Sequence, residues 1–498
     1  MFKYWKEFTL FSVITTVYVI CTTPALSWAG FDCDLGDFMY SAKYGGVLHF
    51  PGFPIYAALS WLIVRIPVGT EGFRMALFLS ALPSIITCVL VFLAVKKQTL
   101  NAWSPYVAAM ALAGANIFLM QSIIAEVYAL TTMLLAATYT AIIYGRYRVA
   151  AVFAGLTASM HIMALPAVIA FFIWSKEFRS RWRIFIPAAI VPYIYVVFMG
   201  ATRESFSMMG SGFWGFLQYV VGTVSDNMQW WLSLPMWRIP EKIGLTIIVF
   251  VVAFGLALIP MLKQLWDWRR SGILLAAIVI PSVYFFGCVV GLAVVHLMLA
   301  IPFMAIAAGL GINKIRMHPA PIFACSVILL VVMPLNYDIG RTLDKNLAAE
   351  TVYESFSEIL EGAIVVNLCR WESEDGIGDT ILGGISGREQ TLLYIYSKES
   401  GIDIVPLNIS AYVSDLEVPG FGNAGVYYRE QLSEKYQINT PFVDLGEDVE
   451  DKEKYWANAV LIAESNPERG LYYTLIDRNS PLDRRLIRYE KEDQFVTP

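Results

Sequence analysis

Residues 74–95 read RMALFLSALPSIITCVLVFLAV, an apolar run with one charged side chain, Arg74, at its start. A helix needs roughly 20 apolar residues to cross about 30 Å of hydrocarbon, so this run is long enough to span a membrane. Lys96 and Lys97 follow it directly, and such residues are most common at the cytoplasmic ends of spans. The run therefore predicts a helical membrane protein with residue 74 on the outer side.

The whole chain has the composition of such a protein. Of its 498 residues, 57% are hydrophobic and only 15% are charged, whereas soluble proteins carry about 25% charged residues. Residues 1–336 hold 21 basic and 11 acidic side chains, a balance of +10, and residues 337–498 hold 15 and 30, a balance of −15. This split predicts a membrane domain over 1–336 and a soluble domain over 337–498. The acidic charge of the soluble part excludes nucleic acid as a partner, because phosphates would repel it.

Further apolar runs predict spans at 8–28, 103–119, 122–144, 184–200, 243–262, 272–292, 295–312 and 318–336. Residues 149–173 are apolar but have basic residues at both ends, so we expect two short half-helices that turn near Met160 and His161. This gives about 11 membrane segments. Fifteen lysines and arginines then lie at the predicted cytoplasmic ends and six at the outer ends. The expected topology is a cytoplasmic N-terminus and an extracytoplasmic C-terminal domain, in the cell membrane or, in a eukaryote, the endoplasmic reticulum.

The first run, 8–28, has an alternative interpretation as a signal peptide, because Pro24 to Ala29 resembles a cleavage region. We favour an uncleaved helix, since the segment that follows makes sense only when it is held near the membrane. The six cysteines show no paired spacing, which argues against a disulfide framework or a zinc site. Of the six, only Cys33 and Cys369 are in segments that could meet outside the bilayer.

Two long outer loops and a tail complete the expected architecture. In loop 29–73, residues 55–66 predict an amphipathic helix in the membrane interface, and loop 201–242 holds four tryptophans typical of headgroup depth. In the tail, strand-like and helical runs alternate, which predicts a soluble α/β domain. The strand-like runs are 362–366, 402–406, 459–463 and 471–475, and the helical ones are 346–361 and 388–400.

Acidic residues are rare before residue 336, yet Asp32, Asp34 and Asp37 lie within six positions. Asp34 and Asp37 are three apart, so on a helical turn both carboxylates share one face. Such a pair suits a general base or a cation ligand, and Asp32 with Asp34 has the spacing of a divalent-cation pair. The alternative is a polar turn in which an aspartate caps a helix that begins near Phe38.

A proline-rich turn lies just downstream, where residues 49–54 read HFPGFP. Two prolines and a glycine exclude regular helix here, so we expect a rigid turn that holds His49 in place. The alternative is a simple stiff loop.

The run from Asp34 to Tyr56 reads DLGDFMYSAKYGGVLHFPGFPIY. It resembles the signature of the membrane O-mannosyltransferase-like family in the GT-C glycosyltransferase superfamily, an Asp-x-Gly-Glu element followed by Gly-Val/Ile-x-His-Pro-Pro-Gly-Tyr-Pro. The matching positions, in register and without gaps, are Asp34, Gly36, Gly46, Val47, His49, Pro51, Gly52 and Pro54. Three positions differ, with Asp37 in place of Glu, Phe50 in place of Pro and Phe53 in place of Tyr.

Three more segments resemble the family in order: Arg74 with residues 79–82, residues 125–130 (AEVYAL), and residues 155–161, where Met160 replaces an asparagine before His161. The resemblance implies a GT-C-like fold. It also implies transfer of a sugar, a hexose such as mannose, from a polyprenyl-phosphate carrier to an extracytoplasmic protein or glycan acceptor, with inversion.

This chemistry needs a base for the acceptor hydroxyl and cationic help for the departing phosphate. We expect Asp34 to be the base and Asp37 to orient Asp34 or the acceptor. We expect Arg74 to bind the carrier phosphate, with Arg203 and Arg238 as alternative partners, although Arg74 can also be read as an interfacial anchor. His49 and Glu126 are further substrate-binding candidates, since an ionisable residue in an apolar segment is a functional candidate by default. His161 and His296 are expected to be hydrogen-bonded packing residues.

Two other classes of function remain open at this point. A lipid-linked-sugar transporter or flippase would place charges near the bilayer midplane and would show repeated halves, and neither feature is visible. A non-catalytic scaffold would use the membrane domain only to present the tail.

Overall fold

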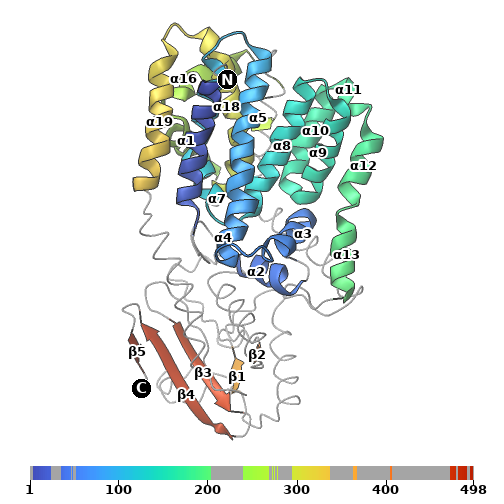
Figure 1. Cartoon of the computed structure of the whole chain (residues 1–498), viewed down its shortest axis with the longest axis vertical. Helices are drawn as coiled ribbons and strands as arrows, with labels where there is room; N and C mark the ends of the chain where they lie inside the picture. Colours follow the sequence, from blue (N-terminus) through green and yellow to red (C-terminus); the bar gives the residue numbers. More distant parts are fainter. Residues whose placement is uncertain are drawn as a thin grey trace. The chain divides into compact units, whose positions relative to one another are not determined.

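A computed structural model gives the architecture (Figure 1). The chain divides into two compact units, Met1–Leu347 and Ala348–Pro498, which are considered separately. The structure describes residues 4–23, 35–45, 48, 52–202, 239–267, 272, 274, 277–278 and 294–336 of the first unit, and 363–366, 404–405, 471–477, 480–490 and 494–496 of the second.

The first unit is helical, and its helices follow the apolar runs of the sequence. In its first half they are α1 (Trp5–Cys21), α2 (Leu35–Tyr44), α3 (Pro54–Ile63), α4 (Glu71–Met75), the π-helix η1 (Ala76–Ala81), α5 (Leu82–Gln98), α6 (Ser104–Ala113), α7 (Asn116–Ser122), α8 (Val127–Ile143) and α9 (Tyr147–Met160). After them come η2 (Ile162–Ala164), α10 (Leu165–Trp174), α11 (Lys176–Arg179), α12 (Trp182–Ile190), α13 (Tyr193–Thr202), α15 (Ile239–Phe254), η4 (Gly255–Ala257), α16 (Leu258–Trp266), η5 (Val294–Ala300), α18 (Ile301–Gly311), η6 (Ile312–Lys314) and α19 (Pro319–Asn336).

Four helical stretches in the described part of the chain are long and apolar enough to cross a membrane: Glu71–Gln98, Trp182–Met199, Lys242–Trp266 and Leu297–Lys314. A fifth arises if α7 and α8, which meet at 115°, form one broken span. The count of about 11 segments stays a prediction, and most of the run 272–292 lies outside the described residues.

The structure confirms the turn near His161. Helix α9 ends at Met160 and α10 begins at Leu165. At 1.5 Å per residue the two helices are about 21 and 15 Å long, so each is shorter than the roughly 30 Å of hydrocarbon.

The single helix expected over 103–119 is wrong, because α6 ends at Ala113 and α7 begins at Asn116. Gly114 lies at this break, where a Cβ would come 2.5 Å from the Ser326 carbonyl oxygen of α19. The close approach of two backbones therefore accompanies the break, and an apolar count along the sequence does not register it.

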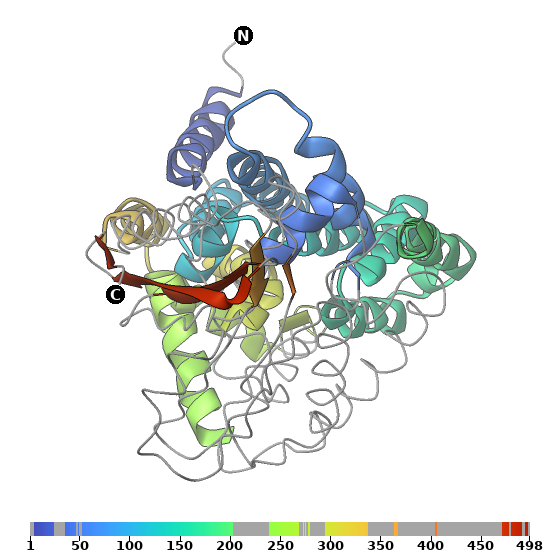
Figure 2. The same ribbon diagram turned by 90° about the horizontal axis from the view of Figure 1, so that it is seen from below.

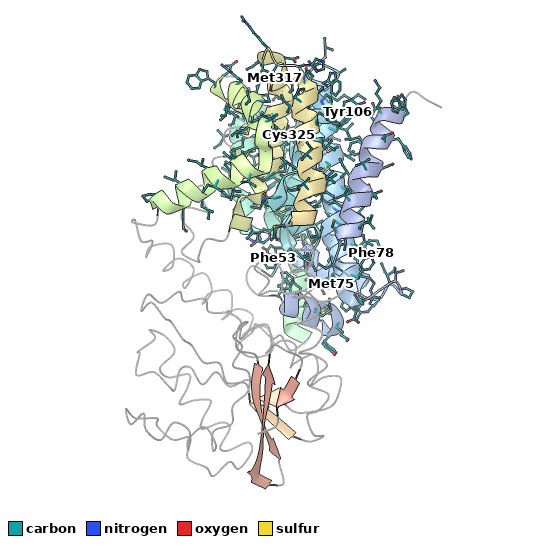
Figure 3. The ribbon with its side chains drawn as sticks, turned by 90° about the vertical axis from the view of Figure 1, so that its left-hand side faces the viewer. Phe53, Met75, Phe78, Tyr106, Met317 and Cys325 are labelled. Atoms are coloured by element: carbon teal, nitrogen blue, oxygen red, sulfur yellow. The ribbon has the colours of Figure 1, made fainter. Side chains whose placement is uncertain are left out.

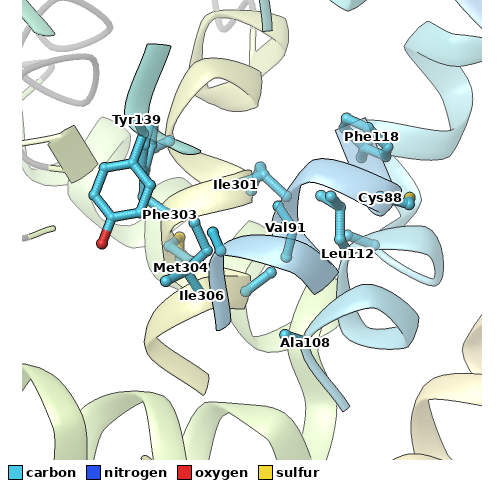
Figure 4. Packing of buried hydrophobic residues seen from close by; sticks show 14 of the residues in the cluster. Cys88, Val91, Ala108, Leu112, Phe118, Tyr139, Ile301, Phe303, Met304 and Ile306 are labelled. Carbon is cyan, nitrogen blue, oxygen red and sulfur yellow. The ribbon is translucent and has the colours of Figure 1, made fainter. Parts of the chain in front are cut away.

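Small side chains let the helices approach closely, and aromatic side chains fill the remaining space (Figure 4). The rings of Tyr139, Phe171 and Phe303 contact one another with centroids 5.6 to 6.0 Å apart. At Gly155 a Cβ would lie 2.5 Å from the Cβ of Ala188, so α9 and α12 pack almost backbone to backbone. Glycine and alanine at such contacts are typical of membrane helices.

Helices α12 and α13 lie at one edge of the unit, opposite α19 (Figure 2). Only 11% of the apolar window over Trp182–Met199 is buried. Its outward face is apolar, with Ile190 60% and Ile194 65% exposed, as expected for a helix that faces lipid.

The second unit contains a five-stranded sheet of order β2-β1-β3-β4-β5. Strands β1 (Ala363–Val366) and β2 (Ile404–Val405) pair in parallel, and the other neighbours, including β3 (Leu471–Asp477), β4 (Ser480–Glu490) and β5 (Gln494–Val496), pair antiparallel. The strands β1, β2 and β3 were predicted, but β4 and β5 were not. The expected strand 459–463 and helices 346–361 and 388–400 lie outside the described residues, so the α/β character of this unit stays a prediction.

Candidate functional site

The sequence motifs meet at one end of the helical unit. Helix α2 begins close to the Phe38 predicted from the sequence, and α3 corresponds to the predicted interfacial helix. Phe53 and Met75 lie at this end, whereas Met317 lies at the opposite end (Figure 3). Lys43 of α2 pairs with Glu71 of α4 at 3.4 Å. This ion pair joins α2 to the start of the membrane-spanning stretch Glu71–Gln98.

The turn before α3 has an unusual backbone. Gly52 has a φ of +84°, and Phe53 has a φ of +33°, the one positive value among the non-glycine residues described. A bulky residue in this region costs of order 1–3 kcal/mol and persists only where its surroundings hold it. The ring of Phe53 is buried against Phe38, with centroids 6.1 Å apart. Phe38 in turn packs on Tyr56 at 4.9 Å.

The imidazole of His161 lies between the rings of Phe53 and Tyr128, at centroid distances of 5.3 and 5.5 Å. Its Nδ1 accepts a hydrogen bond from the Met163 backbone N–H at 3.1 Å. A neutral imidazole that accepts at Nδ1 carries its proton on Nε2. The prediction that His161 is a hydrogen-bonded packing residue is confirmed, and the structure adds that it joins three motif segments.

Glu126 lies at the sharp break between α7 and α8 and is only 3% exposed. Its carboxylate accepts from the Val127 N–H at 3.2 Å and so caps α8. Its backbone N–H donates to the Ser80 hydroxyl at 3.1 Å, and its carbonyl accepts from the same hydroxyl at 3.2 Å. Ser80 belongs to the π-helix η1, a form of helix that is rare and frequent at functional sites.

Arg74 is 8% exposed and lies in the first turns of the membrane-spanning stretch Glu71–Gln98. Its guanidinium donates to the carbonyls of Val64 at 2.6 Å, Gly69 at 2.9 Å and Val68 at 3.4 Å. These three bonds hold the turn between α3 and α4. The Nε of Arg74 is buried and has no hydrogen-bond partner among the described residues.

Arg65, in the same turn, was named in the sequence only as part of an interfacial helix. Its guanidinium lies 3.9 Å from the centre of the Trp61 ring, and its Nη1 donates to the carbonyls of Ala42 and Trp61. The side chain is exposed and forms no ion pair with the residues described. No motif in the sequence distinguishes Arg65 from other interfacial arginines, so only its position in the folded protein makes it a candidate site residue.

Several predicted site residues lie outside the described residues: Asp32, Asp34, His49, Arg203 and Arg238. Asp37 lies in the first turn of α2, and the structure describes its backbone but not its side chain. Within the described ranges, no group of three or more His, Cys, Asp or Glu gathers that would hold a metal ion. The possible cation pair at Asp32 and Asp34 therefore stays a prediction.

Comparison with known proteins gives one informative result. No family model and no curated protein matches the chain. The crystal structure of ArnT from Cupriavidus metallidurans bound to undecaprenyl phosphate superposes with a TM-score of 0.52 and 9% identity, covering 82% of this chain and 91% of that one.

The chain has the fold of ArnT. The apo structure of the same protein gives a TM-score of 0.45 and 10% identity, over 80% of this chain and 89% of that one. ArnT has the GT-C membrane fold, so the predicted GT-C-like fold is confirmed. The long apolar helices of the described part of the chain are those of an integral membrane protein. At 9% identity the likeness concerns the fold alone, and the narrower O-mannosyltransferase-like family is not shown.

Proposed function

We propose that this chain is a membrane glycosyltransferase that moves a sugar from a polyprenyl-phosphate carrier to an extracytoplasmic acceptor. The meeting of Phe53, His161 and Tyr128 carries the proposal, because these rings join the proline-rich turn, the half-helix turn and the AEVYAL segment at one end of the bundle. The shared fold with ArnT, a protein crystallised with undecaprenyl phosphate, supports it independently.

In this proposal Asp34 removes the proton from the acceptor hydroxyl, and the sugar is transferred in a single displacement with inversion. Asp34 directly precedes Leu35, the first residue of α2. Helix α2 is fixed on the proline-rich turn by the contact of Phe38 with Phe53. The helix that follows Asp34 and the turn that follows His49 therefore pack against each other. This contact supports a joint role of Asp34 and His49 in one site. Asp37 then orients Asp34 or the acceptor.

The departing phosphate needs cationic partners. Arg74 is our first candidate, although three of its hydrogen bonds go to carbonyls of its own turn. Arg203 and Arg238 remain alternatives, and His49 and Glu126 are proposed to bind the donor or the acceptor. A hexose such as mannose is the proposed sugar, and a divalent cation at Asp32 and Asp34 remains part of the proposal.

The test is Asp34→Asn in the purified full-length protein, supplied with a polyprenyl-phosphate hexose. A general base contributes about 10²–10⁴-fold, so we expect sugar transfer to fall by at least 10². Asp267→Asn is the matched control, because Asp267 pairs with Lys314 at 3.4 Å outside the motif segments. Wild-type transfer by Asp34→Asn would remove the proposed base, and unchanged thermal stability would show that a loss of transfer is chemical.

A further inference from the structure

A groove of about 570 Å³ lies between α3 and the junction of α12 with α13. Ile55, Ala58 and Leu59 of α3 line one wall, and Val191, Ile194 and Phe198 line the other. The lining is apolar except for Tyr195, whose hydroxyl donates to the Ala57 carbonyl at 3.4 Å. Its volume lies within the range of about 300–1,000 Å³ of ligand sites, and its lining suits a hydrocarbon chain.

A cation lies near one end of this groove. Trp61 of α3 packs against the buried cluster of Val196 and Met199 on α13, as Tyr195 of the groove does, and the guanidinium of Arg65 lies over the Trp61 ring. The Arg65 guanidinium also lies close enough to the Tyr195 hydroxyl to interact with it electrostatically. Arg65 lies six positions after Leu59 in the chain, which corresponds to about 9 Å at helical rise. An apolar groove with a cation at its end is complementary to a lipid that has one long chain and an anionic head.

The guanidinium of Arg65 has a free edge. Both of its hydrogen bonds start from Nη1, so Nε and Nη2 have no partner among the described residues. These two groups form the edge that binds phosphate through two parallel hydrogen bonds. Arg74 differs, because its guanidinium is buried and bonded to carbonyls of the same turn. At this groove the exposed cation is therefore Arg65, whereas Arg74 stays the candidate for the departing phosphate at the reacting position.

Arg65 contacts the end of α2 that lies farther along the chain from the proposed base. Arg65 binds the Ala42 carbonyl in the last turn of α2, while Asp34 precedes the first turn. Ala42 lies seven positions after Leu35, the first residue of α2, which corresponds to about 10 Å along the helix. A phosphate held by Arg65 therefore lies near the end of α2 that is opposite Leu35, the residue after the proposed base.

We propose that this groove and Arg65 form a loading site at which the polyprenyl-phosphate carrier docks from the bilayer before it moves to the base. The isoprenoid chain lies between α3 and α12–α13, and the phosphate binds the Nε–Nη2 edge of Arg65. The proposal rests on the proposed function for the identity of the lipid. A groove filled only by bulk phospholipid is the competing outcome.

Photo-crosslinking tests the occupant directly. The full-length protein in phosphatidylcholine nanodiscs is labelled with undecaprenyl phosphate that carries a diazirine on its isoprenoid chain, and the labelled peptides are identified by mass spectrometry. We expect label on residues 54–61 and 191–198, removed by an excess of unmodified undecaprenyl phosphate. Equal labelling by a diazirine phosphatidylglycerol, without competition by undecaprenyl phosphate, would overturn the proposal.

Two variants test separately how the isoprenoid chain and the phosphate of the lipid bind. Ala58→Trp fills the groove, and we expect it to abolish labelling by both undecaprenyl phosphate and the neutral polyprenol. Ile186→Trp is its control, since Ile186 is exposed on α12 but does not line the groove. Arg65→Gln should weaken labelling by the phosphate probe roughly tenfold or more while leaving the polyprenol unchanged, because a charge-assisted hydrogen bond is lost. Arg179→Gln, at an exposed arginine elsewhere, is the control for charge.

Kinetics distinguish loading from chemistry. We expect Arg65→Gln to raise the KM for the carrier roughly tenfold with kcat unchanged. The lost interaction would bind the substrate and the transition state equally, so its removal affects KM alone. A fall in kcat with unchanged KM would place Arg65 in the reacting site and would overturn a loading role. Labelling does not depend on sugar transfer, so specific labelling without transfer would reject the proposed function alone, and transfer without labelling would reject the groove alone.

Discussion

The imidazole of His161 contacts two rings that lie far before it in the chain, Tyr128 by 33 residues and Phe53 by 108. We expect His161→Ala to destabilise the protein by about 1–3 kcal/mol, because two aromatic contacts of about 0.5–1.5 kcal/mol each are lost. His161→Phe keeps the stack but leaves the Met163 N–H without its acceptor, so it should be intermediate. Thermal unfolding of the purified variants measures the order, and equal midpoints for His161→Ala and the wild type would contradict it.

At the residue scale the sequence predicts local chemistry well and distant partners poorly. The two prolines and the glycine of residues 49–54 predict a rigid turn, and the described part of that turn has the left-handed backbone at Gly52 and Phe53. Nothing in those residues predicts that Phe53 meets His161, because the contact depends on how separate helices pack. Arg65 is missed for the same reason, since its free edge results from the contacts of the folded turn.

Among the elements, the π-helix η1 is bonded to the start of α8 through the hydroxyl of Ser80. We expect Ser80→Ala to cost about 1–3 kcal/mol, because the buried N–H and carbonyl of Glu126 both lose their partner. Ser104→Ala is the matched control: the Ser104 hydroxyl is also buried but has no hydrogen-bond partner among the described residues, so its loss should be close to neutral. The test compares thermal midpoints with protease cleavage between residues 122 and 127. Equal effects of the two substitutions would contradict this role.

The sequence finds most helices of the described part, yet it misses breaks that packing causes. Charge marks the turn between α9 and α10, since basic residues at both ends of 149–173 exclude a single crossing. No charge marks the break at Gly114, where the backbone of α19 approaches closely. Strands β4 and β5 are not predicted from the sequence for another reason. Strand β4 carries arginines among its apolar residues, which weakens the apolar pattern along the sequence.

At the scale of the whole molecule, exposed arginines gather where α8 meets α9 and where α11 meets α12: Arg146, Arg148, Arg179 and Arg183. Helix α11 lies at one end of the helical unit and α2, α3 and α4 lie at the other (Figure 1). The positive-inside rule then predicts that the basic end lies in the cytoplasm and the candidate site outside. That orientation is also what an extracytoplasmic acceptor requires.

Cysteine labelling in intact cells tests this orientation. In a background without native cysteines, Val68→Cys introduces a thiol in the exposed turn beside Arg65, and Arg146→Cys introduces one at the basic end. We expect a membrane-impermeant maleimide to label position 68 in intact cells and position 146 only after lysis. Because both positions are exposed, accessibility to the reagent differs only by the side of the membrane. The reverse pattern would put the candidate site in the cytoplasm, where an extracytoplasmic acceptor is out of reach, and the proposed reaction would then have to be abandoned whatever the fate of Asp34.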